Sequence, residues 1–459
     1  MPGLRGFDVL IIGGGQAGPS LADALARVGR RVALVERRHL GGSCVNFGCT
    51  PTKAAIASAR VAHLARRGAE FGLNIPQVEV DFAAVMRRAR AVALKSRAGL
   101  DAWMTSADNP LLLRGHARLE GRAESGFRVQ VGDESVVAAN VVLDTGTRTF
   151  VPPIDGLQTV AFIHAGNWLD LQALPESIAV LGGGAIGLEM AQFYRRMGSR
   201  VAVVEAVARI AAREDPEVSD ALQGFLAAEG IEFHLGTTVE RIEARENGVT
   251  LRLRGSASPM LSVSHVFVAT GRKPNSDDLG LGTVGVAVDA HGFIQVDPRL
   301  GTTVRGIWAA GDVRVGPQFT HTAWDDYRIL LSQLAGDRQR TTERIVPYAI
   351  FTDPELGRVG VTETEARRSG RPIKVGRFDM ARNGKAAEIG ETKGFIKVIA
   401  DADSNRILGA AVLAVDAAEL VHGYIDLMNA DAPATAMADA IHIHPTLMEA
   451  VQSAVAAIA

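Results

Sequence analysis

The sequence predicts an α/β protein with two doubly wound, Rossmann-like domains, followed by a C-terminal α+β region. Two stretches predict the doubly wound domains, because each contains an apolar strand, a G-x-G-x-x-G turn and a helix in that order. The second stretch repeats the first at a constant offset of 169 residues, from Gly13 to Gly182 and from Glu36 to Glu205. After Arg340 strands and helices no longer alternate in this way, and this change predicts the α+β region.

The composition is that of an ordinary globular protein. A chain of 459 residues has room for about two to four domains. Its 49 basic and 51 acidic residues give a formal charge of −2, which argues against binding to nucleic-acid phosphates. No apolar run approaches the roughly 20 residues of a membrane span, and the first residues lack the regions of a signal peptide. We therefore expect a cytoplasmic protein that binds neither nucleic acid nor membranes.

The glycines and one acid of the first unit have separate physical tasks. Gly13 permits a tight turn, Gly15 lets a diphosphate reach N–H groups at a helix N-terminus, and Gly18 allows close packing of helix on strand. Glu36, which follows Gly18 by 18 residues, is placed to accept hydrogen bonds from ribose hydroxyls. The expected elements of this unit are a strand at 7–12, a helix at 20–28 and a strand at 31–35.

The second unit repeats these features and predicts a second dinucleotide site. Gly182, Gly184 and Gly187 occupy the turn, and Glu205 ends the second strand. Two sites on one chain predict a relay of electrons between two dinucleotides. The Glu205 carboxylate favours NADH over NADPH, because it bonds a free 2′-hydroxyl and repels a 2′-phosphate unless a cation such as Arg209 compensates. The expected elements are a strand at 177–181, a helix at 188–197 and a strand at 201–204.

Three further strands end in short polar turns that are candidates for cofactor contacts. Thr145 with Gly146, and Gly271, follow two strands that we expect at outer positions of their sheets. Asp312 follows a third strand, where its carboxylate is placed to hold a polyol hydroxyl. Ordinary turns, and an Asp that caps the next segment, are the alternatives. The expected strands span 141–143, 263–268 and 307–310.

The two cysteines of the chain, Cys44 and Cys49, are only five positions apart. A regular helix separates such residues by about 7.5 Å along its axis, beyond the roughly 7 Å that a disulfide tolerates. Gly48 and Pro51 supply local reasons for a distorted backbone. A strained or exposed disulfide is more easily reduced, as a working redox pair requires. Half of a zinc site, or two unconnected thiols, are the alternatives.

The two fingerprints, together with the segments GGSCVNFGCTPTK (41–53), ATGRKPN (269–275), AAGD (309–312) and HPTLME (444–449), resemble the pyridine nucleotide–disulfide oxidoreductases. The resemblance covers nearly the whole chain and implies FAD in the first site, a nicotinamide in the second, and a homodimer closed by a C-terminal interface domain. It implies an FAD-binding domain at 1–150, an NAD(P)-binding domain at 151–271, a central segment at 272–345 and a dimerisation domain at 346–459.

The resemblance also implies roles for residues around the cysteines. Cys49 resembles the thiol beside the flavin and Cys44 the interchange thiol that attacks the substrate. Lys53 resembles the lysine near flavin N5, with Glu189 as its ion-pair partner. A cation there would stabilise negative charge on the reduced flavin. Gly42, in the same segment, is expected to contact FAD.

Histidines near the C-terminus are candidates for proton transfer. The resemblance implies that His444 carries the proton and that Glu449 orients it, across the dimer interface from the interchange cysteine of the second subunit. We expect Glu449 in a helix opened by Pro445. His442 matches a second histidine of some lipoamide dehydrogenases; the alternative is that it is a packing residue. The expected elements of this region are strands at 347–351, 394–400 and 407–415, and helices at 362–369 and 417–429.

The segment 319–327, which contains His321, opens a further predicted helix, whose N-terminal N–H groups could face the flavin's pyrimidine edge. The alternative is that His321 is a cap and that Trp324 and Tyr327 pack.

We therefore predict an enzyme in which NADH reduces FAD, and FAD reduces the Cys44–Cys49 disulfide. The dithiol then reduces a small disulfide of the dihydrolipoamide type or another low-molecular-weight disulfide, with no metal cofactor. Mercuric-reductase-like reduction of metal ions, quinones or oxidised thiol species is one alternative, although the further cysteine pair typical of mercuric reductases is missing. A non-enzymatic flavoprotein subunit is another. Asp144 departs from the family, which usually has alanine before Thr-Gly.

Overall fold

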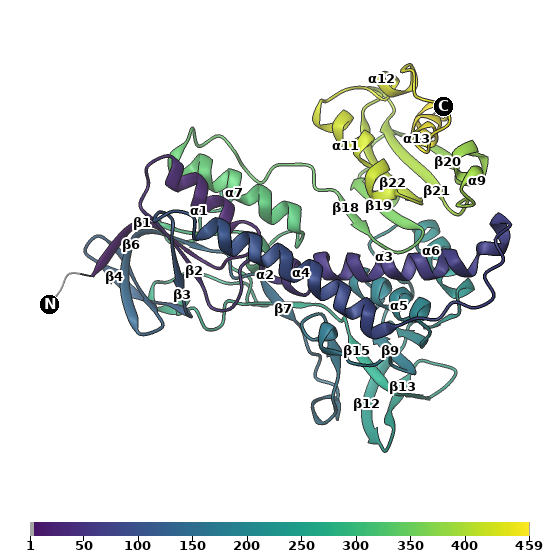
Figure 1. Ribbon diagram of the computed structural model, residues 1–459. Coiled ribbons are helices and arrows are strands. Elements are labelled where there is room, and N and C mark those ends of the chain that lie inside the picture. The colour runs from purple at the N-terminus through teal and green to yellow at the C-terminus, as the bar shows by residue number, and fades with distance from the viewer. Residues whose placement is uncertain (1–3, 459) are drawn as a thin grey trace.

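The computed structural model describes residues 4–458, and three regions are evident in it. The first doubly wound unit lies at the left of Figure 1, the second at the lower right, and the C-terminal region at the upper right. Two long helices, α3 (Cys49–Arg66) and α4 (Phe82–Met104), pack side by side and extend from the first unit towards the second (Figure 1). The predicted combination of two parallel-sheet units and an α+β region is confirmed.

The first unit is built on a seven-stranded sheet with β1 near its centre. The strand order is β3-β2-β1-β6-β5-β4, with β17 also paired to β6. Strand β6 is therefore an inner strand, and the prediction that 141–143 lies at an outer position was wrong. Residues 141–143, at the end of β6, are inner because they pair with β1 on one side and with β17 on the other. The strands are β1 (Arg5–Ile12), β2 (Val32–Glu36), β3 (Leu111–Arg114), β4 (Ala117–Ala123), β5 (Gly126–Val131), β6 (Glu134–Leu143) and β17 (Ile307–Ala309).

Two helices pack together against the parallel part of this sheet (Figure 1). They are α1 (Gly18–Arg27), which follows the first fingerprint, and α7 (Thr320–Ala335), which comes from far along the sequence. Buried Leu21 and Leu25 of α1 share one core with Ile329 and Leu330 of α7. The central segment of the chain thus returns to the first unit, and it brings the start of α7 to the cysteine helices.

The second unit has a five-stranded parallel sheet in the order β11-β10-β9-β15-β8. The expected strand at 263–268 is interrupted at Ser264: its first part joins an antiparallel sheet, and β15 lies inside the parallel one. The Ser264 and Ser177 side chains bond each other's backbone N–H groups at 3.0 Å, which holds the break in place. The elements are β8 (Ile163–His164), β9 (Ser177–Leu181), α5 (Ala185–Met197), β10 (Arg200–Val204), α6 (Pro216–Ala228), β11 (Ile231–His234), β12 (Thr238–Arg245), β13 (Gly248–Arg254), β14 (Met260–Val263) and β15 (His265–Val268).

The C-terminal region packs helices on an antiparallel sheet in the order β18-β19-β22-β21-β20. The predicted helix at 417–429 is two helices, because Tyr424 N–H bonds the Val421 carbonyl only three residues back. The last helix begins at Met448 and not at Pro445, because the Thr446 N–H donates to the Glu449 side chain. The elements are β18 (Tyr348–Ile350), β19 (Glu355–Gly360), α8 (Glu363–Arg368), β20 (Ile373–Asp379), α9 (Gly384–Glu388), β21 (Phe395–Asp401), β22 (Ile407–Ala414), α10 (Ala417–Leu420), α11 (His422–Asn429), α12 (Thr435–Ala438) and α13 (Met448–Ala456).

None of the helices within residues 4–458 combines the length and the apolar character that a membrane span requires.

Candidate active site

The two cysteines lie on separate short segments and not on one helix. Cys44 is in α2 (Gly42–Asn46), and Cys49 is the first residue of α3. Between them the chain leaves the helical path at Phe47, whose carbonyl oxygen accepts a hydrogen bond of 2.7 Å from Trp168 Nε1. Gly48 is needed here because an added Cβ would lie 2.8 Å from the Ser43 carbonyl oxygen. Both cysteines are free thiols in the structure.

The surroundings of the cysteines make their pKa values very different. The hydrogen bond from Cys44 is the main reason that the pKa of Cys49 falls to about 6, and the Thr320 hydroxyl and the Lys53 ammonium lower it further. The Thr320 Oγ1 atom lies 3.3 Å from Cys49 Sγ. The same thiol–thiol bond, together with burial, raises the pKa of Cys44. Cys49 is therefore the thiolate of the pair near neutral pH, and Cys44 keeps its proton.

Three regions of the chain meet beside the cysteines at the Glu189 carboxylate. Its Oε2 atom lies 2.7 Å from Lys53 Nζ of α3, and its Oε1 atom accepts a 3.0 Å hydrogen bond from Phe351 N–H, after β18. The Lys53 ammonium also lies 4.4 Å from the centre of the Phe351 ring. Glu189 itself belongs to α5 and is 6% exposed, so its charge is balanced by Lys53 and not by water.

The two fingerprint turns have the same backbone design. Gly13 and Gly182 have φ values of 115° and 109°, which disfavour any residue with a side chain. A Cβ at Gly13 would also lie 2.2 Å from the Asp144 carbonyl oxygen, and one at Gly182 would lie 2.5 Å from that of Ala269. The third glycine of each fingerprint lies close to the first. A Cβ added to Gly18 would lie 2.2 Å from the Gly13 carbonyl oxygen, and one added to Gly187 would lie 2.0 Å from the Gly182 carbonyl oxygen.

The acids that follow the two fingerprints are held by backbone groups. Glu36 accepts hydrogen bonds from the N–H groups of Gly14 at 2.9 Å and Arg38 at 2.7 Å. Glu205 accepts them from Gly183 at 2.6 Å and from Val207 at 3.0 Å. Because a carboxylate can accept about four hydrogen bonds, capacity remains on both acids for ribose hydroxyls.

The remaining FAD candidates lie around the first fingerprint. Two of them, Thr145 and Gly146, form hydrogen bonds with the backbone of Asn275. Gly42 approaches the fingerprint closely, since its added Cβ would lie 3.0 Å from Gly15 Cα. Asp312 is half-buried, and the loss of solvent raises the pKa of its carboxyl, which accepts a hydrogen bond of 3.2 Å from Thr147 Oγ1. Thr145 Oγ1 donates to the Asn275 carbonyl oxygen at 2.7 Å, and the Gly146 carbonyl oxygen accepts from Asn275 N–H at 2.9 Å.

In the second unit, Gly184 and Gly271 have open space, because a Cβ added to either would meet nothing within 4 Å.

His321, in the first turn of α7, contacts the start of the C-terminal region. Its Nε2 atom lies 2.7 Å from the Pro347 carbonyl oxygen, and burial lowers its pKa. Its ring stacks on Phe319, 5.4 Å between centres, and Phe319 stacks in turn on Tyr348 at 5.5 Å. The side chain of His321 therefore fixes the start of α7 relative to β18.

His444 and Glu449 form a pair, with 3.0 Å between His444 Nδ1 and Glu449 Oε1. The Thr446 N–H and the His444 imidazole lower the pKa of Glu449. His444 is 78% exposed, and no hydrogen bond joins it to either cysteine within residues 4–458. His442 Nδ1 is buried without a hydrogen-bond partner, and the neighbouring Ile441 is fully exposed.

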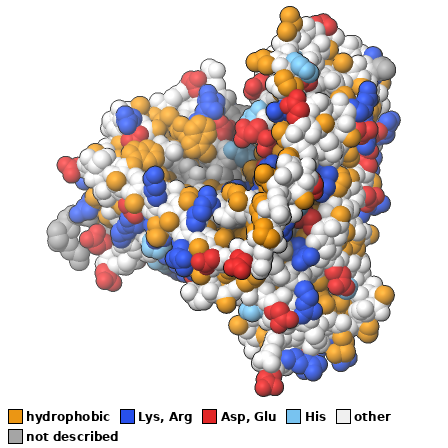
Figure 2. All heavy atoms as spheres, turned by 45° about the vertical axis from the view of Figure 1, so that its right-hand side comes forward, with side chains coloured by type: hydrophobic (Ala, Val, Ile, Leu, Met, Phe, Trp, Pro, Cys, Tyr) orange, Lys and Arg blue, Asp and Glu red, His pale blue; other side chains and the backbone are white. Residues whose placement is uncertain are grey.

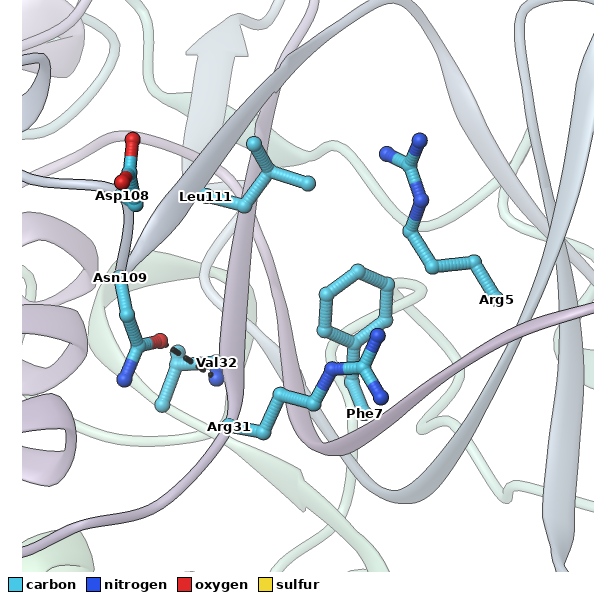
Figure 3. Close-up of a pocket in the computed structure, with 7 residues that line it drawn as sticks. All are labelled: Arg5, Phe7, Arg31, Val32, Asp108, Asn109 and Leu111. Atoms are coloured by element: carbon cyan, nitrogen blue, oxygen red, sulfur yellow. Dashed lines mark hydrogen bonds between the residues drawn. The ribbon is translucent and has the colours of Figure 1, made fainter.

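Two surface hollows of the first unit lie apart from the cysteine pair. One, of about 350 Å³, lies where β1, β2 and β3 begin, at the sheet edge opposite the glycine turn; Arg5, Phe7 and Arg31 contribute to its wall (Figure 3). The other, of about 480 Å³, is lined by charged and amide side chains beyond Glu36, including Arg37 and Arg148. Figure 2 shows a depression in the surface of the molecule, with histidine and acidic side chains beside it.

No cluster of three or more His, Cys, Asp or Glu side chains in the described part of the chain is arranged to hold a metal ion.

Two residues at the site make contacts that the sequence did not indicate. Thr320 contacts Cys49 across 271 positions of sequence, and nothing in its local pattern indicates this contact. Asp144 was noticed only as a departure from the family. In the structure it is buried, and its Oδ2 atom accepts a hydrogen bond of 2.9 Å from Gly18 N–H.

Comparisons with known proteins agree with this geometry. Residues 7–326 match the family model "Pyridine nucleotide-disulphide oxidoreductase", and residues 346–455 match its dimerisation domain. A dihydrolipoyl dehydrogenase of Cupriavidus necator is 33% identical, over 98% of this chain and 98% of that protein. The probable pyridine nucleotide-disulfide oxidoreductase RclA of Escherichia coli is 34% identical, over 96% and 97%.

Solved structures extend the likeness to three dimensions. The HOCl-induced flavoprotein disulfide reductase RclA from Escherichia coli superposes with a TM-score of 0.90 at 33% identity, over 99% of this chain and 100% of that one. Its Cu(II) complex gives a TM-score of 0.88 at 34% identity, over 96% and 98%. The dithiol site, the two fingerprints and these matches lead to one conclusion: the chain belongs to the pyridine nucleotide-disulphide oxidoreductases, FAD-dependent enzymes that use NAD(P)H and act on sulfur groups.

Proposed function

We propose that this enzyme is an NADH-dependent disulfide reductase in which electrons reach a small disulfide through Cys49 and Cys44. One observation carries the proposal. Two free thiols lie together, and one of them, Cys49, has its pKa lowered to about 6 by Cys44, Thr320 and Lys53. A thiolate beside a protonated thiol is the reactive form of a dithiol that reduces disulfides.

The residues of the first unit fit FAD. The α1 N-terminus and the closely packed glycines leave backbone N–H groups for a diphosphate, and the Asp312 carboxyl provides a polar group for a polyol. The chemistry that FAD supplies when bound is two-electron transfer between the nicotinamide and the cysteine pair. We assign FAD binding to Gly13, Gly15, Gly18, Glu36, Gly42, Lys53, Thr145, Gly146, Asp312 and His321.

We assign the nicotinamide dinucleotide to the second unit, at Gly182, Gly184, Gly187, Glu205 and Gly271. The negative charge of Glu205 favours NADH over NADPH. Arg209, the cation that could offset this charge, instead lies 3.2 Å from Asp220 in an exposed ion pair.

In the proposed reaction, His444 takes the proton from Cys44. The Cys44 sulfur then attacks one sulfur of the substrate disulfide, so that a mixed disulfide forms and the other substrate sulfur leaves as a thiolate, which takes up a proton from His444. The Cys49 thiolate attacks the Cys44 sulfur next, which forms the Cys44–Cys49 disulfide and releases the second substrate sulfur. Glu449 keeps the His444 ring oriented through its 3.0 Å contact.

We propose a cytoplasmic homodimer in which each subunit supplies His444 to the Cys44 of the other. The exposure of His444 and its lack of a hydrogen bond to either described cysteine support this arrangement, as does the dimerisation domain. We divide the chain into an FAD-binding domain at 1–150, an NAD(P)-binding domain at 151–271, a central segment at 272–345 and a dimerisation domain at 346–459.

The test is an anaerobic titration of the yellow protein with NADH and, separately, with NADPH. We expect two-electron reduction to produce a long-wavelength charge-transfer band that is missing in Cys49→Ser. In a separate steady-state assay, we expect NADH to give a larger kcat/KM than NADPH. Cys44→Ser should still allow flavin reduction but should abolish turnover of disulfides. Bleaching of the flavin without that band in the native enzyme, or full disulfide turnover by Cys44→Ser, would contradict the dithiol mechanism.

Reduction of metal ions is a second candidate, because a relative that is 34% identical was solved as a Cu(II) complex. The two candidates separate in the Cys44→Ser variant. Direct reduction of Cu(II) by the flavin would survive this substitution, whereas reduction of dihydrolipoamide-type or other small disulfides would not.

A further inference from the structure

The two fingerprint turns differ at one buried position. Asp144 follows the last residue of β6 and is 5% exposed, while Ala269 takes the equivalent position after β15. Both residues place their carbonyl oxygen against the first glycine of the fingerprint. The carboxyl group of Asp144 is thus an addition to a backbone arrangement that the second unit builds without it.

The Asp144 carboxyl lies between two segments that we assign to FAD. Its Oδ2 atom accepts the 2.9 Å hydrogen bond from Gly18 N–H, in the first turn of α1, and lies 3.0 Å from a Cβ added to Gly15. Its Oδ1 atom faces the turn that holds Asp312, since it lies 2.8 Å from a Cβ added to Gly311. In the second unit, by contrast, a Cβ added to Gly184 meets nothing within 4 Å.

The groups around Asp144 favour its neutral form. Burial is the main reason that the pKa of Asp144 is raised well above its usual range, and the Gly18 N–H only partly opposes this. The carboxyls of Asp326 on α7, Asp312 beyond β17 and Glu36 on β2 raise it further.

Basic side chains nearby are directed to the other acids. Arg314 lies 2.8 Å from Asp326, which Arg344 also contacts, and Arg272 lies 3.8 Å from Asp312. No ion pair joins Asp144 to a basic side chain in residues 4–458.

The protonation state of the Asp144 carboxyl determines whether it repels or binds a diphosphate at the N-terminus of α1. An ionised Asp144 could only accept hydrogen bonds, and it would repel the diphosphate at the N-terminus of α1. A neutral acid can accept from Gly18 N–H with one oxygen and donate from its O–H to a phosphate oxygen.

We propose that Asp144 stays protonated in the FAD-bound enzyme and donates a hydrogen bond to the FAD diphosphate, so that FAD binding is linked to a proton. The inference rests on the proposed placement of FAD in the first unit. Its consequence has a definite sign: the FAD-free protein loses this proton as the pH rises, and must regain it on binding. FAD affinity therefore falls as the pH rises.

Infrared difference spectra of the holoenzymes test the protonation directly. We expect the native enzyme at neutral pH to show the carbonyl absorption of a protonated carboxylic acid that is missing in Asp144→Asn. Asp144→Ala places at this position the residue that the second unit has, Ala269. Its spectrum can be subtracted from the native spectrum instead if the Asn variant does not fold. If both subtractions lack this band, Asp144 is ionised and the proposal is wrong.

FAD affinity, measured by fluorescence during reconstitution of the apoprotein between about pH 6 and 9, tests the linkage. The native affinity should fall with pH by up to about tenfold per unit, whereas Asp144→Asn should bind with an affinity independent of pH. The same pH profile in both proteins would overturn the linkage.

A third variant separates failure of this proposal from failure of the FAD assignment. Gly15→Glu places a carboxylate in the same loop and should release FAD if the assignment is correct. Loss of FAD in Gly15→Glu together with a missing infrared band would contradict only the Asp144 proposal. Retention of FAD in Gly15→Glu would contradict the placement of FAD itself.

Discussion

The two dinucleotide-binding units share a backbone but differ in how their turns are enclosed. In the first unit the Asp144 carboxyl fills the space beside Gly15, and the cysteine segment presses Gly42 against the same glycine. In the second unit Gly184 has free space around it. The same fold, repeated in one chain, thus serves two purposes. The enclosed turn suits a cofactor that stays bound, and the open turn suits one that enters and leaves at each cycle.

The largest expected effects come from the same substitution in both turns. Gly15→Glu should weaken FAD binding by at least about a hundredfold, because the added side chain crowds the Asp144 carboxyl and its carboxylate repels the diphosphate. Gly184→Glu should leave the protein yellow, since its side chain has room, but should lower kcat/KM for NADH by a similar factor. Bound-flavin absorbance and stopped-flow reduction measure the two effects. A colourless Gly184→Glu protein would show that the two sites are not independent.

The acids after the two fingerprints offer a second contrast. Glu205→Ala should raise the ratio of kcat/KM for NADPH to that for NADH by roughly thirtyfold, because it removes the charge that repels the 2′-phosphate. Glu36→Ala is the matched control and should weaken FAD without changing the nicotinamide preference. Steady-state kinetics with NADH and with NADPH measure this ratio in each variant. An unchanged ratio in Glu205→Ala would mean that another residue sets the preference.

Transfer of the buried carboxyl to the second unit tests whether this group alone makes dinucleotide binding depend on pH. Ala269→Asp should give NADH binding the pH dependence that we propose for FAD, with affinity lower by about tenfold at the alkaline end. Isothermal titration with NADH at several pH values measures this change, and Ala269→Asn is the uncharged control. If the Asp and Asn variants bind NADH alike at all pH values, position 269 does not reproduce the environment of Asp144.

The smallest expected effect concerns the cysteine pair, which only the first unit carries. Because the pKa of Cys49 is lowered to about 6, the charge-transfer band of the two-electron-reduced enzyme should appear as the pH rises through that value. Thr320→Val removes a hydrogen bond to the thiolate and should move this midpoint upward by roughly half a unit. Thr320→Ser should restore it. A midpoint that is the same in all three proteins would exclude a role for the hydroxyl.

Local patterns in the sequence predicted much of the scaffold. Strand β9 begins and ends where it was expected, and the two fingerprints align at their constant spacing because each is a short strand–turn–helix unit. The interruption at Ser264 and the division of 417–429 at Val421 were missed, since both depend on hydrogen bonds with other segments or on a change of bond pattern within one turn.

The contacts that tune the site were harder to predict because they join distant segments. Asp144 reaches Gly18 across 126 positions, and Cys49 reaches Thr320 across 271. No periodicity encodes such pairs. The inner position of β6 was missed for a similar reason, because β17 comes from the other side of the second unit in sequence. Resemblance supplied Lys53 and Glu189, whose 2.7 Å ion pair the residues alone would not have indicated.

The meeting of Lys53, Glu189 and Phe351 has a consequence for how such a chain can diversify. Each of the three belongs to a different region, and a single carboxylate bonds the other two. A region imported from a relative would therefore have to bring a matching partner for this junction, or leave a buried charge unbalanced. The three regions are separate in architecture, yet an exchange of any one of them must preserve what that region contributes to this junction.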